Sequence, residues 1–165
     1  MYAKVHLRTS AKKAVRNAYS ATILGGQLDG VRGDIAAPRL KSTALSAITL
    51  QLVVLGHSTR TLLQQVLGCW MFVLIFRRPM LSILSQVYHE GLGCHADEIF
   101  RLSHDARQEL LLLVILVPCA MSNLRAEPST RRYCTDAAPF GAGICSCEVP
   151  LQASTELLRF ADHKG

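Results

Sequence analysis

A single carboxylate, Asp136, stands in the last third of the chain among residues that would let a ligand approach it closely. The run 131–149 is rich in Tyr, Cys and Thr in its first half and carries Ile and Val in its second, with Pro139 and Gly141 between them. This pattern predicts a β-hairpin that ends before Pro150. Small residues follow the acid, so a backbone or a substrate could reach it. The carboxylate could bind a metal ion, or it could cap the turn.

Other residue clusters offer less chemistry. His89, Cys94, His95 and His104 form one loose group, and a second group, Cys134, Cys145 and Cys147, could meet across the hairpin. Neither group has the paired Cys-x-x-Cys spacing of structural zinc sites, so no zinc site is expected. The sequence also has no phosphate-binding Gly-x-x-x-x-Gly-Lys and no Gly-x-Ser-x-Gly of a serine hydrolase.

Composition limits the classes of protein that fit. The 165 residues make one domain, or a domain and a fragment. Half of the residues are hydrophobic and only 18% are charged, against about 25% in ordinary soluble domains. The chain therefore needs a partner, or more polypeptide, to cover its apolar surface. A net charge of +6 favours anionic partners, either nucleic acid or acidic lipid.

The segment 1–20 carries only basic charges, and the rest of the chain suggests a reduced environment. Several of the six cysteines lie in apolar runs, which favours an intracellular protein, nuclear or cytoplasmic. The basic segment resembles a mitochondrial transit peptide in composition, so a mitochondrial location is the alternative. No transmembrane segment is expected, because the uncharged runs 66–76 and 110–124 are shorter than the roughly 20 residues that cross a bilayer.

The elements that must position these residues are mostly helical, which predicts an α+β fold with a β-hairpin at each end. A strand over 21–28, the turn Asp29-Gly30 and a return strand at 35–37 form the first hairpin. A polar linker at 124–130 leads to the second, and a short helix is predicted over 155–163.

Four helices lie between the hairpins, and each is marked by capping or breaking residues. The first follows Pro38 and stops at Gly56, and Ser58 or Thr59 caps the second, which is expected to be buried on several sides. Arg77-Arg78-Pro79 interrupts that helix, and a third runs from Pro79 to Gly91. Ser103 caps a fourth, which begins with Asp105 and Glu109 before the buried run 110–117.

The C-terminal hairpin resembles a known catalytic module. Thr135-Asp136-Ala137-Ala138, followed by Gly141-Ala142-Gly143, is similar to the first strand and turn of the ribonuclease H domain of retroelement reverse transcriptases. The resemblance implies that Asp136 corresponds to the first of several carboxylates that hold two magnesium ions in that family. Asp136 is therefore the candidate catalytic and metal-binding residue.

The preceding motifs occur in the order of the same family. Leu24-Gly25-Gly26 resembles the palm hairpin that contacts the primer, and Pro38-Arg39-Leu40 resembles the start of the helix after it. The run 61–68 resembles a thumb motif, and the segment 102–110 resembles the connection helix. The resemblance and the position of three arginines near helix ends imply a set of residues that contact nucleic acid: Leu24, Gly25, Arg60, Arg77 and Arg78.

The departures from the family predict lost activity. No Tyr-x-Asp-Asp or other Asp-Asp pair occurs, so the metal-binding aspartates of polymerisation are absent. Glu148, Glu156 and Asp162 follow Asp136, but none can be assigned to the second carboxylate of ribonuclease H. The chain is expected to be a truncated retroelement fragment, inactive alone and without bound magnesium, with weak non-specific affinity for nucleic acid and possible contacts to other parts of its parent polyprotein.

The expected division is a basic segment at 1–20, palm-end, thumb and connection elements at 21–123, and a truncated ribonuclease H hairpin with its tail at 131–165. Two other interpretations stay open. One is a small basic helical protein targeted to mitochondria or to a membrane surface, and the other is a working nuclease that uses Asp136.

Overall fold

The computed structural model of the chain describes residues 15–138 and 140–161. Helices and short antiparallel strands occur together in these ranges, so the predicted α+β class is confirmed. The chain divides into two compact units, one up to Leu124 and the other from Arg125 onward. The boundary falls at the start of the polar stretch predicted as a linker. Most of the basic segment 1–20 lies outside the described residues.

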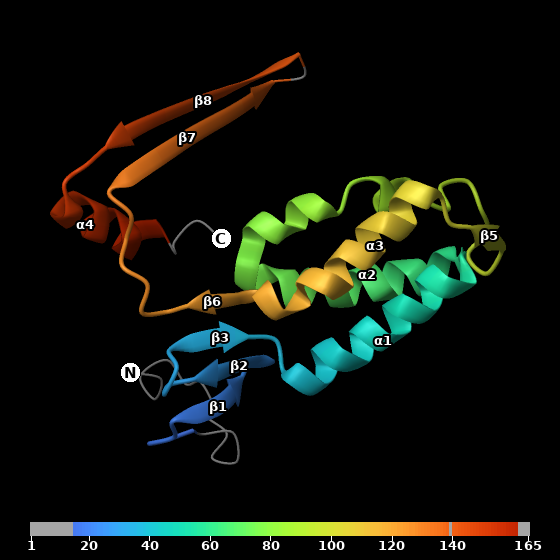
Figure 1. Ribbon diagram of the computed structural model, residues 1–165, viewed down its shortest axis with the longest axis horizontal. Coiled ribbons are helices and arrows are strands. Elements are labelled where there is room, and N and C mark those ends of the chain that lie inside the picture. Colours follow the sequence, from blue (N-terminus) through green and yellow to red (C-terminus); the bar gives the residue numbers. More distant parts are fainter. Residues whose placement is uncertain (1–14, 139, 162–165) are drawn as a thin grey trace, which may run out of the picture. The chain divides into compact units, whose positions relative to one another are not determined.

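The first unit contains a small antiparallel sheet with the strand order β1-β2-β3-β6 (Figure 1). Its strands are β1 (Ser20–Ile23), β2 (Gly26–Asp29), β3 (Asp34–Ala36) and β6 (Met121–Asn123). Strands β1 to β3 form a meander, whereas β6 comes from the other end of the unit and pairs with β3, with Met121 opposite Ala36. This long-range pairing joins the two ends of the first unit in one sheet.

The predicted strand over 21–28 is wrong. Leu24 and Gly25 form a two-residue turn in its middle, so that Ile23 pairs with Gly26. The dipeptide Asp29-Gly30 begins a longer connection between β2 and β3 rather than a tight hairpin turn. A run of apolar and small residues cannot by itself reveal a turn whose backbone conformation depends on a glycine within it.

The connection after β2 is organised by the carboxylate of Asp29. Its Oδ1 accepts hydrogen bonds from the backbone N–H groups of Val31 and Arg32, each at 3.0 Å. These bonds, the one from Arg32 above all, hold the pKa of the Asp29 carboxyl below its usual value. The carboxylate thus accepts hydrogen bonds from backbone N–H groups that would otherwise donate to a neighbouring strand.

Three α-helices form the body of the first unit: α1 (Arg39–Leu55), α2 (Arg60–Leu74) and α3 (His104–Leu116). Their ends follow the predicted caps. Gly56 adopts the left-handed conformation after α1, with φ 67°. The hydroxyl of Thr59 accepts a hydrogen bond from the N–H of Leu62 at 3.2 Å, and Ser103 does the same for Ala106 at 3.2 Å.

The core lies where these helices meet, and α2 contributes most to it. Its buried residues are Leu63, Val66, Leu67, Trp70, Val73 and Leu74. The indole N–H of Trp70 donates to the hydroxyl of Thr49 on α1 at 2.9 Å, and both side chains are fully buried. Between α3 and α1, Arg107 donates to the carbonyl of Val53 at 3.0 Å. These bonds give buried polar groups the hydrogen-bond partners that the surrounding apolar side chains cannot supply.

The predicted third helix is wrong as an α-helix. Two short 3₁₀ helices, η3 (Ile75–Ile83) and η4 (Gln86–His89), occupy this stretch. The carboxylate of Glu109 on α3 accepts hydrogen bonds from three consecutive backbone N–H groups, those of Ser85, Gln86 and Val87, at 3.0, 2.8 and 3.0 Å. Glu109 therefore does more than balance the dipole of its own helix. It fixes the start of η4 against α3.

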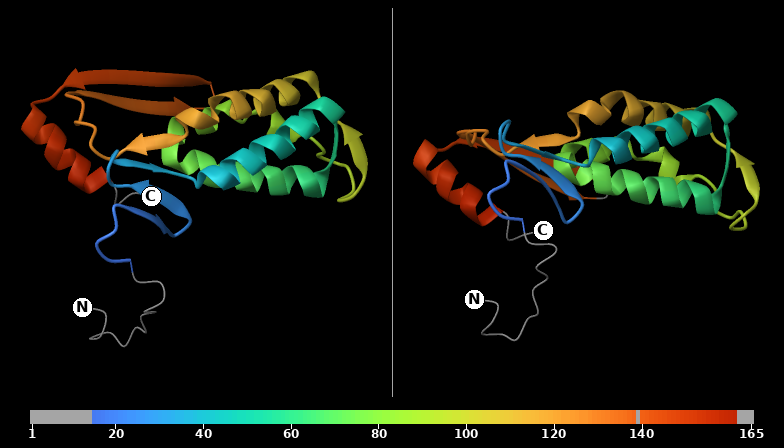
Figure 2. Two further views of the ribbon diagram at one scale, coloured as in Figure 1. Left: turned by 60° about the horizontal axis from the view of Figure 1, so that its bottom comes forward. Right: turned by 90° about the horizontal axis from the view of Figure 1, so that it is seen from below.

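Two further elements complete the unit. Strands β4 (His57–Thr59) and β5 (Ile99–Arg101) pair at the junction of α1 and α2, and the 3₁₀ helix η5 (Val117–Cys119) connects α3 to β6. In both views of Figure 2 the four-stranded sheet lies at one end of the helices and β5 at the other. The sheet therefore adjoins the N-terminal end of α1 and the C-terminal ends of α2 and α3.

The helices leave much apolar surface exposed, contrary to the prediction that 66–76 and 110–117 are buried. On α3 only Ala106, Leu110 and Leu113 are buried. The larger apolar side chains that remain exposed on α1, α2 and α3 are Leu40, Ile48, Leu50, Val54, Leu55, Leu62, Met71, Phe72, Leu111, Leu112 and Ile115. Each helix thus buries one stripe and presents another to its surroundings.

One segment of the described residues, Arg60–Ile83, is long and apolar enough to cross a membrane by length and composition alone. The α-helical part of that segment, α2, has 15 residues. This corresponds to about 22 Å, which is shorter than the roughly 30 Å hydrocarbon core of a bilayer. In this conformation the segment would have to be rearranged before it could span a bilayer.

The second unit consists of β7 (Arg131–Ala138), β8 (Gly141–Glu148) and α4 (Leu151–Ala161). The strands pair antiparallel, with Arg131 opposite Glu148 and Ala138 opposite Gly141. Helix α4 begins before the predicted 155–163, and positions 162 and 163 lie outside the described residues. The guanidinium of Arg132 donates to the carbonyl of Ser154 on α4 at 2.7 Å and also to its hydroxyl. Polar contacts around the buried Ser154 therefore join the helix to the hairpin.

Candidate functional site

The turn between β1 and β2 presents the first predicted nucleic-acid contact to solvent. Leu24 and Gly25 both have positive φ, 50° and 85°, as a tight two-residue hairpin turn requires. Leu24 tolerates this conformation poorly, whereas Gly25 adopts it without steric cost. The side chain of Leu24 is 98% exposed.

The same turn rests on two aromatic side chains from the end of α2 and the start of η3. A Cβ atom at Gly25 would lie 3.0 Å from Cζ of Phe72, and one at Gly26 would lie 3.0 Å from the ring of Phe76. The two rings pack edge to face, with centroids 5.6 Å apart and an interplanar angle of 89°. Glycines in the turn thus let the backbone approach the aromatic pair closely.

Arg77 and Arg78 follow directly where the helical path breaks. Arg77 has non-helical backbone angles, with φ −143° and ψ 69°, and both arginine side chains are exposed. The hydroxyl of Ser122 on β6 donates to the carbonyl of Phe76, which anchors the break to the sheet. Because Phe76 contacts the β1–β2 turn, the break and the turn lie side by side. We call Leu24, Gly25, Phe72, Phe76, Arg77 and Arg78 the hairpin–kink surface.

The third predicted arginine is not part of this surface. Arg60 occupies the first position of α2, and Phe76 follows the other end of that helix. The helix separates its two ends by about 21 Å. Leu24, Gly25, Arg77 and Arg78 are therefore brought together by the fold, whereas Arg60 is not.

A groove beside the hairpin–kink surface adds one more cation. It lies between α1 and α2, has a volume of about 650 Å³, and its lining includes Phe72, Gly68 and Lys41. The sequence analysis missed Phe72, Phe76 and Lys41 as site residues. The four-residue spacing of the two phenylalanines was the available signal, since it places both rings on one helix face.

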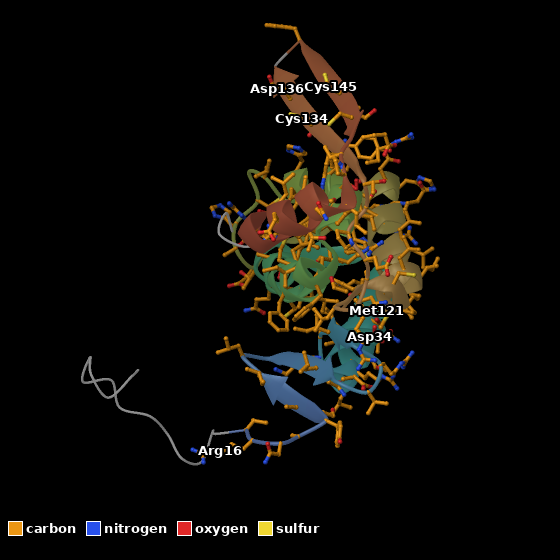
Figure 3. All side chains as sticks on the ribbon, turned by 90° about the vertical axis from the view of Figure 1, so that its left-hand side faces the viewer. Arg16, Asp34, Met121, Cys134, Asp136 and Cys145 are labelled. Atoms are coloured by element: carbon orange, nitrogen blue, oxygen red, sulfur yellow. The ribbon has the colours of Figure 1, made fainter. Side chains whose placement is uncertain are left out.

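The candidate catalytic carboxylate, Asp136, lies on β7 opposite Gly143. Its side chain is exposed, and none of the described residues donates a hydrogen bond to it. Figure 3 shows Asp136 together with Cys134 and Cys145 on the hairpin, toward its turn. Capping of its own turn, the alternative left open by the sequence, is not what the described hydrogen bonds show. The carboxylate points into solvent from a two-stranded ribbon.

Magnesium does not fit the acidic residues placed around Asp136. Glu148 is opposite Arg131, five positions before Asp136 along β7, which corresponds to about 17 Å. The odd offset puts the two carboxylates on opposite faces of the hairpin. Glu148 also forms an ion pair with Arg131 at 2.7 Å. Throughout the described part of the chain, no three His, Cys, Asp or Glu side chains meet in a metal-binding group, so the histidine and cysteine groups do not form one either.

No protein-family model, no curated protein and no solved structure matches this chain.

Proposed function

We propose that this chain derives from a retroelement reverse transcriptase, from the end of the palm to the first strands of ribonuclease H, and that it retains non-specific binding to nucleic acid. The proposal rests on the order of the sequence motifs and on the hairpin–kink surface. Leu24 and Gly25 are separated from Arg77 and Arg78 by some fifty residues of sequence, yet the β1–β2 turn packs on Phe76, which directly precedes Arg77. This packing of the turn beside the kink is the observation that carries the proposal.

The chemistry of the hairpin–kink surface suits a nucleic acid. Two exposed guanidinium groups can each make hydrogen bonds to phosphate oxygens. The adjacent Phe72 and the exposed Leu24 offer apolar contact to bases or sugars, as in proteins that bind single strands by stacking. The net charge of +6 attracts a polyanion to the molecule at long range. None of these contacts reads a base sequence, so the binding is non-specific.

Catalysis is not part of the proposal. The sequence contains no Asp-Asp pair for the metals of polymerisation, and Asp136 has no second carboxylate placed beside it among the described residues. Template-directed incorporation of nucleotides by the purified chain is expected to equal that of a buffer control. Incorporation above that control would contradict the proposal.

The binding test compares two pairs of arginines. Fluorescence anisotropy with a labelled RNA–DNA duplex is measured over a range of salt concentrations for Arg77→Ala/Arg78→Ala and for the matched control Arg16→Ala/Arg101→Ala. Both controls are exposed arginines that lie outside the hairpin–kink surface, and both variants lose the same net charge. Each lost phosphate contact should reduce the slope of log K against log salt by about 0.9.

The expected result is a slope reduced by about 2 for Arg77→Ala/Arg78→Ala. The control should bind nearly as the wild-type chain does. Equal loss in both variants would show that net charge alone drives binding. Normal binding by Arg77→Ala/Arg78→Ala would remove the hairpin–kink surface from the interaction.

A second candidate function is association with a membrane surface or, through the basic segment 1–20, targeting to mitochondria. The observation that favours it is the number of exposed apolar side chains on the helices, which include Ile48, Val54 and Leu112. Flotation with vesicles that contain acidic lipid tests this candidate. Co-flotation that Ile48→Ser/Val54→Ser abolishes would support membrane binding, whereas a chain that stays at the bottom of the gradient would exclude it.

A further inference from the structure

Three cysteines occupy one face of the C-terminal hairpin. Cys134 on β7 stands directly opposite Cys145 on β8. Cys147 lies two residues further along β8, opposite Arg132, and therefore projects from the same face as Cys145. All three side chains are exposed, and all three are free thiols. Figure 3 shows Cys134 and Cys145 on the two neighbouring strands.

The register places the Cα atoms of Cys134 and Cys145 within the range of a disulfide. The N–H of Val149 donates to the carbonyl of Thr130 at 2.9 Å, so residues 130 and 149 form a hydrogen-bonded pair of the ladder. Cys134 lies four positions beyond Thr130, and hydrogen-bonded pairs recur every second residue. The pair of cysteines is therefore also of this kind, with Cα atoms about 5.5 Å apart. A disulfide accepts this Cα separation, since its range is about 4.4–6.8 Å, but it draws the Cβ atoms to about 3.5–4.5 Å, closer than the roughly 5.5 Å of a hydrogen-bonded pair. Closing the bond therefore needs a small backbone shift, and the resulting strain makes the bond easier to reduce.

The third cysteine is less well placed. Cys147 is the diagonal neighbour of Cys134, and such residues have Cα atoms about 7–8 Å apart. That separation exceeds the reach of a disulfide without backbone movement. The other cysteines, Cys69, Cys94 and Cys119, lie in the first unit on or after α2 and α3. Cys134 and Cys145 are thus the pair that a disulfide joins with the smaller backbone movement.

We propose that Cys134 and Cys145 form a reversible dithiol–disulfide couple that reacts with small-molecule disulfides such as oxidised glutathione. The thiolate of one cysteine attacks a sulfur of the small disulfide, which forms a mixed disulfide and releases one small thiolate. The second cysteine thiolate then attacks the protein sulfur of that mixed disulfide and releases the other small thiolate. The two cysteines lose two protons and two electrons, and the small disulfide is reduced to two thiols.

The disulfide would stabilise the β7–β8 hairpin, which is the less stable part of the chain. A two-stranded hairpin alone is marginally stable in water, and every described residue of β8 is exposed. A bridge between Cys134 and Cys145 closes the loop that contains the turn, which restricts the unfolded forms of the hairpin. The oxidised hairpin is therefore the more rigid one, and it carries Asp136 two residues from the bridge. This couple does not depend on binding of nucleic acid.

The test identifies the bond formed by the full-length chain. The reduced protein is incubated with oxidised glutathione, quenched with acid and alkylated, and then cleaved by chymotrypsin without reduction. Cleavage after Phe140 separates Cys134 from Cys145 and Cys147. The expected product is one linked pair of peptides joined through Cys134 and Cys145. It should persist in Cys147→Ser and disappear in Cys145→Ser, which serves as the matched serine control.

Two outcomes would contradict the proposed couple between Cys134 and Cys145. One is glutathione attached separately to Cys134 and Cys145 without a link between them. The other is a link from Cys134 to Cys147 that is as abundant as the link to Cys145, because it would show that the register does not direct the bond.

Hydrogen exchange supplies a second readout that does not require mapping the bond. Oxidation should slow exchange of the amides in β7 and β8 by about tenfold. Cys134→Ser/Cys145→Ser should show no such response to the oxidant. Equal exchange in the oxidised and reduced wild-type protein would contradict the proposed role of the bond.

Discussion

The two units of this chain are built on opposite principles. In the first, α2 buries six large apolar side chains against α1 and α3, and Trp70 places its indole N–H on a buried hydroxyl. In the second, both strands of the hairpin face solvent, and α4 is joined to it through the guanidinium of Arg132 and Ser154. Apolar burial gives the first unit its stability, whereas hydrogen bonds between exposed elements contribute little. The residue with the most chemical interest, Asp136, therefore lies in the less stable unit.

The largest expected effect is at the centre of the first unit. Trp70→Ala should lower the free energy of unfolding by about 3–5 kcal/mol, because it leaves a cavity and removes the indole N–H that donates to the hydroxyl of Thr49. Urea unfolding followed by far-UV circular dichroism measures this. Tyr133→Ala on the exposed face of β7 is the matched change in the other unit, and about 0.5 kcal/mol or less is expected. Equal losses in the free energy of unfolding would show that apolar burial does not distinguish the two units.

A smaller effect is expected at the cap of η4. Glu109→Ala should cost about 1–3 kcal/mol, because three backbone N–H groups lose their acceptor. The control is Asp105→Ala, an exposed acid in the first turn of the same helix, where the loss should be about 0.3–1 kcal/mol. Comparable urea midpoints for the two variants would show that Glu109 contributes no more to stability than an exposed surface charge does.

The carboxylate of Asp29 should make the first unit sensitive to acid. Hydrogen bonds in the folded state lower its pKa, so its contribution is fully present above the pKa of the unfolded chain and is lost as the pH falls through the lower folded value. Asp29→Asn keeps an acceptor for Val31 and Arg32 but removes the titration. Thermal unfolding between pH 7 and pH 2 should therefore show a weaker pH dependence in Asp29→Asn. Parallel curves for both proteins would rule out this carboxylate as a source of acid sensitivity.

The smallest effect is expected at Asp136. Its carboxylate is exposed and accepts no hydrogen bond from the described residues, so Asp136→Asn should change stability by less than about 0.5 kcal/mol. Hydrolysis of RNA paired with DNA, measured with magnesium, should equal background in both proteins. Cleavage that Asp136→Asn abolishes would favour the working nuclease and would require ligands from outside the described residues.

The parts of the fold that the sequence predicted are governed by local contacts. Gly56, Thr59 and Ser103 end or begin helices because a glycine conformation or a side-chain oxygen satisfies backbone groups within a few residues. Such features need no knowledge of what the chain later packs against.

The errors have a common cause in contacts between distant residues. Glu109 accepts hydrogen bonds from the backbone at 85–87, which lies inside the predicted third helix, and so interrupts that helix. Phe72 and Phe76 lie under the turn at Gly25, which the sequence analysis placed inside a strand. The arrangement of the candidate site residues could not be predicted for the same reason. Leu24, Gly25, Arg77 and Arg78 were named singly, but their meeting required the fold.

We expect nucleic acid to bind the first unit at the hairpin–kink surface. Titration of the isotope-labelled chain with a short RNA–DNA duplex, followed by amide chemical shifts, tests it residue by residue. The largest shifts are expected at Gly25, Gly26, Arg77 and Arg78, with Arg101 and the strands 131–138 and 141–148 unchanged. Shifts concentrated on the C-terminal hairpin, or spread evenly over all exposed cations, would contradict it.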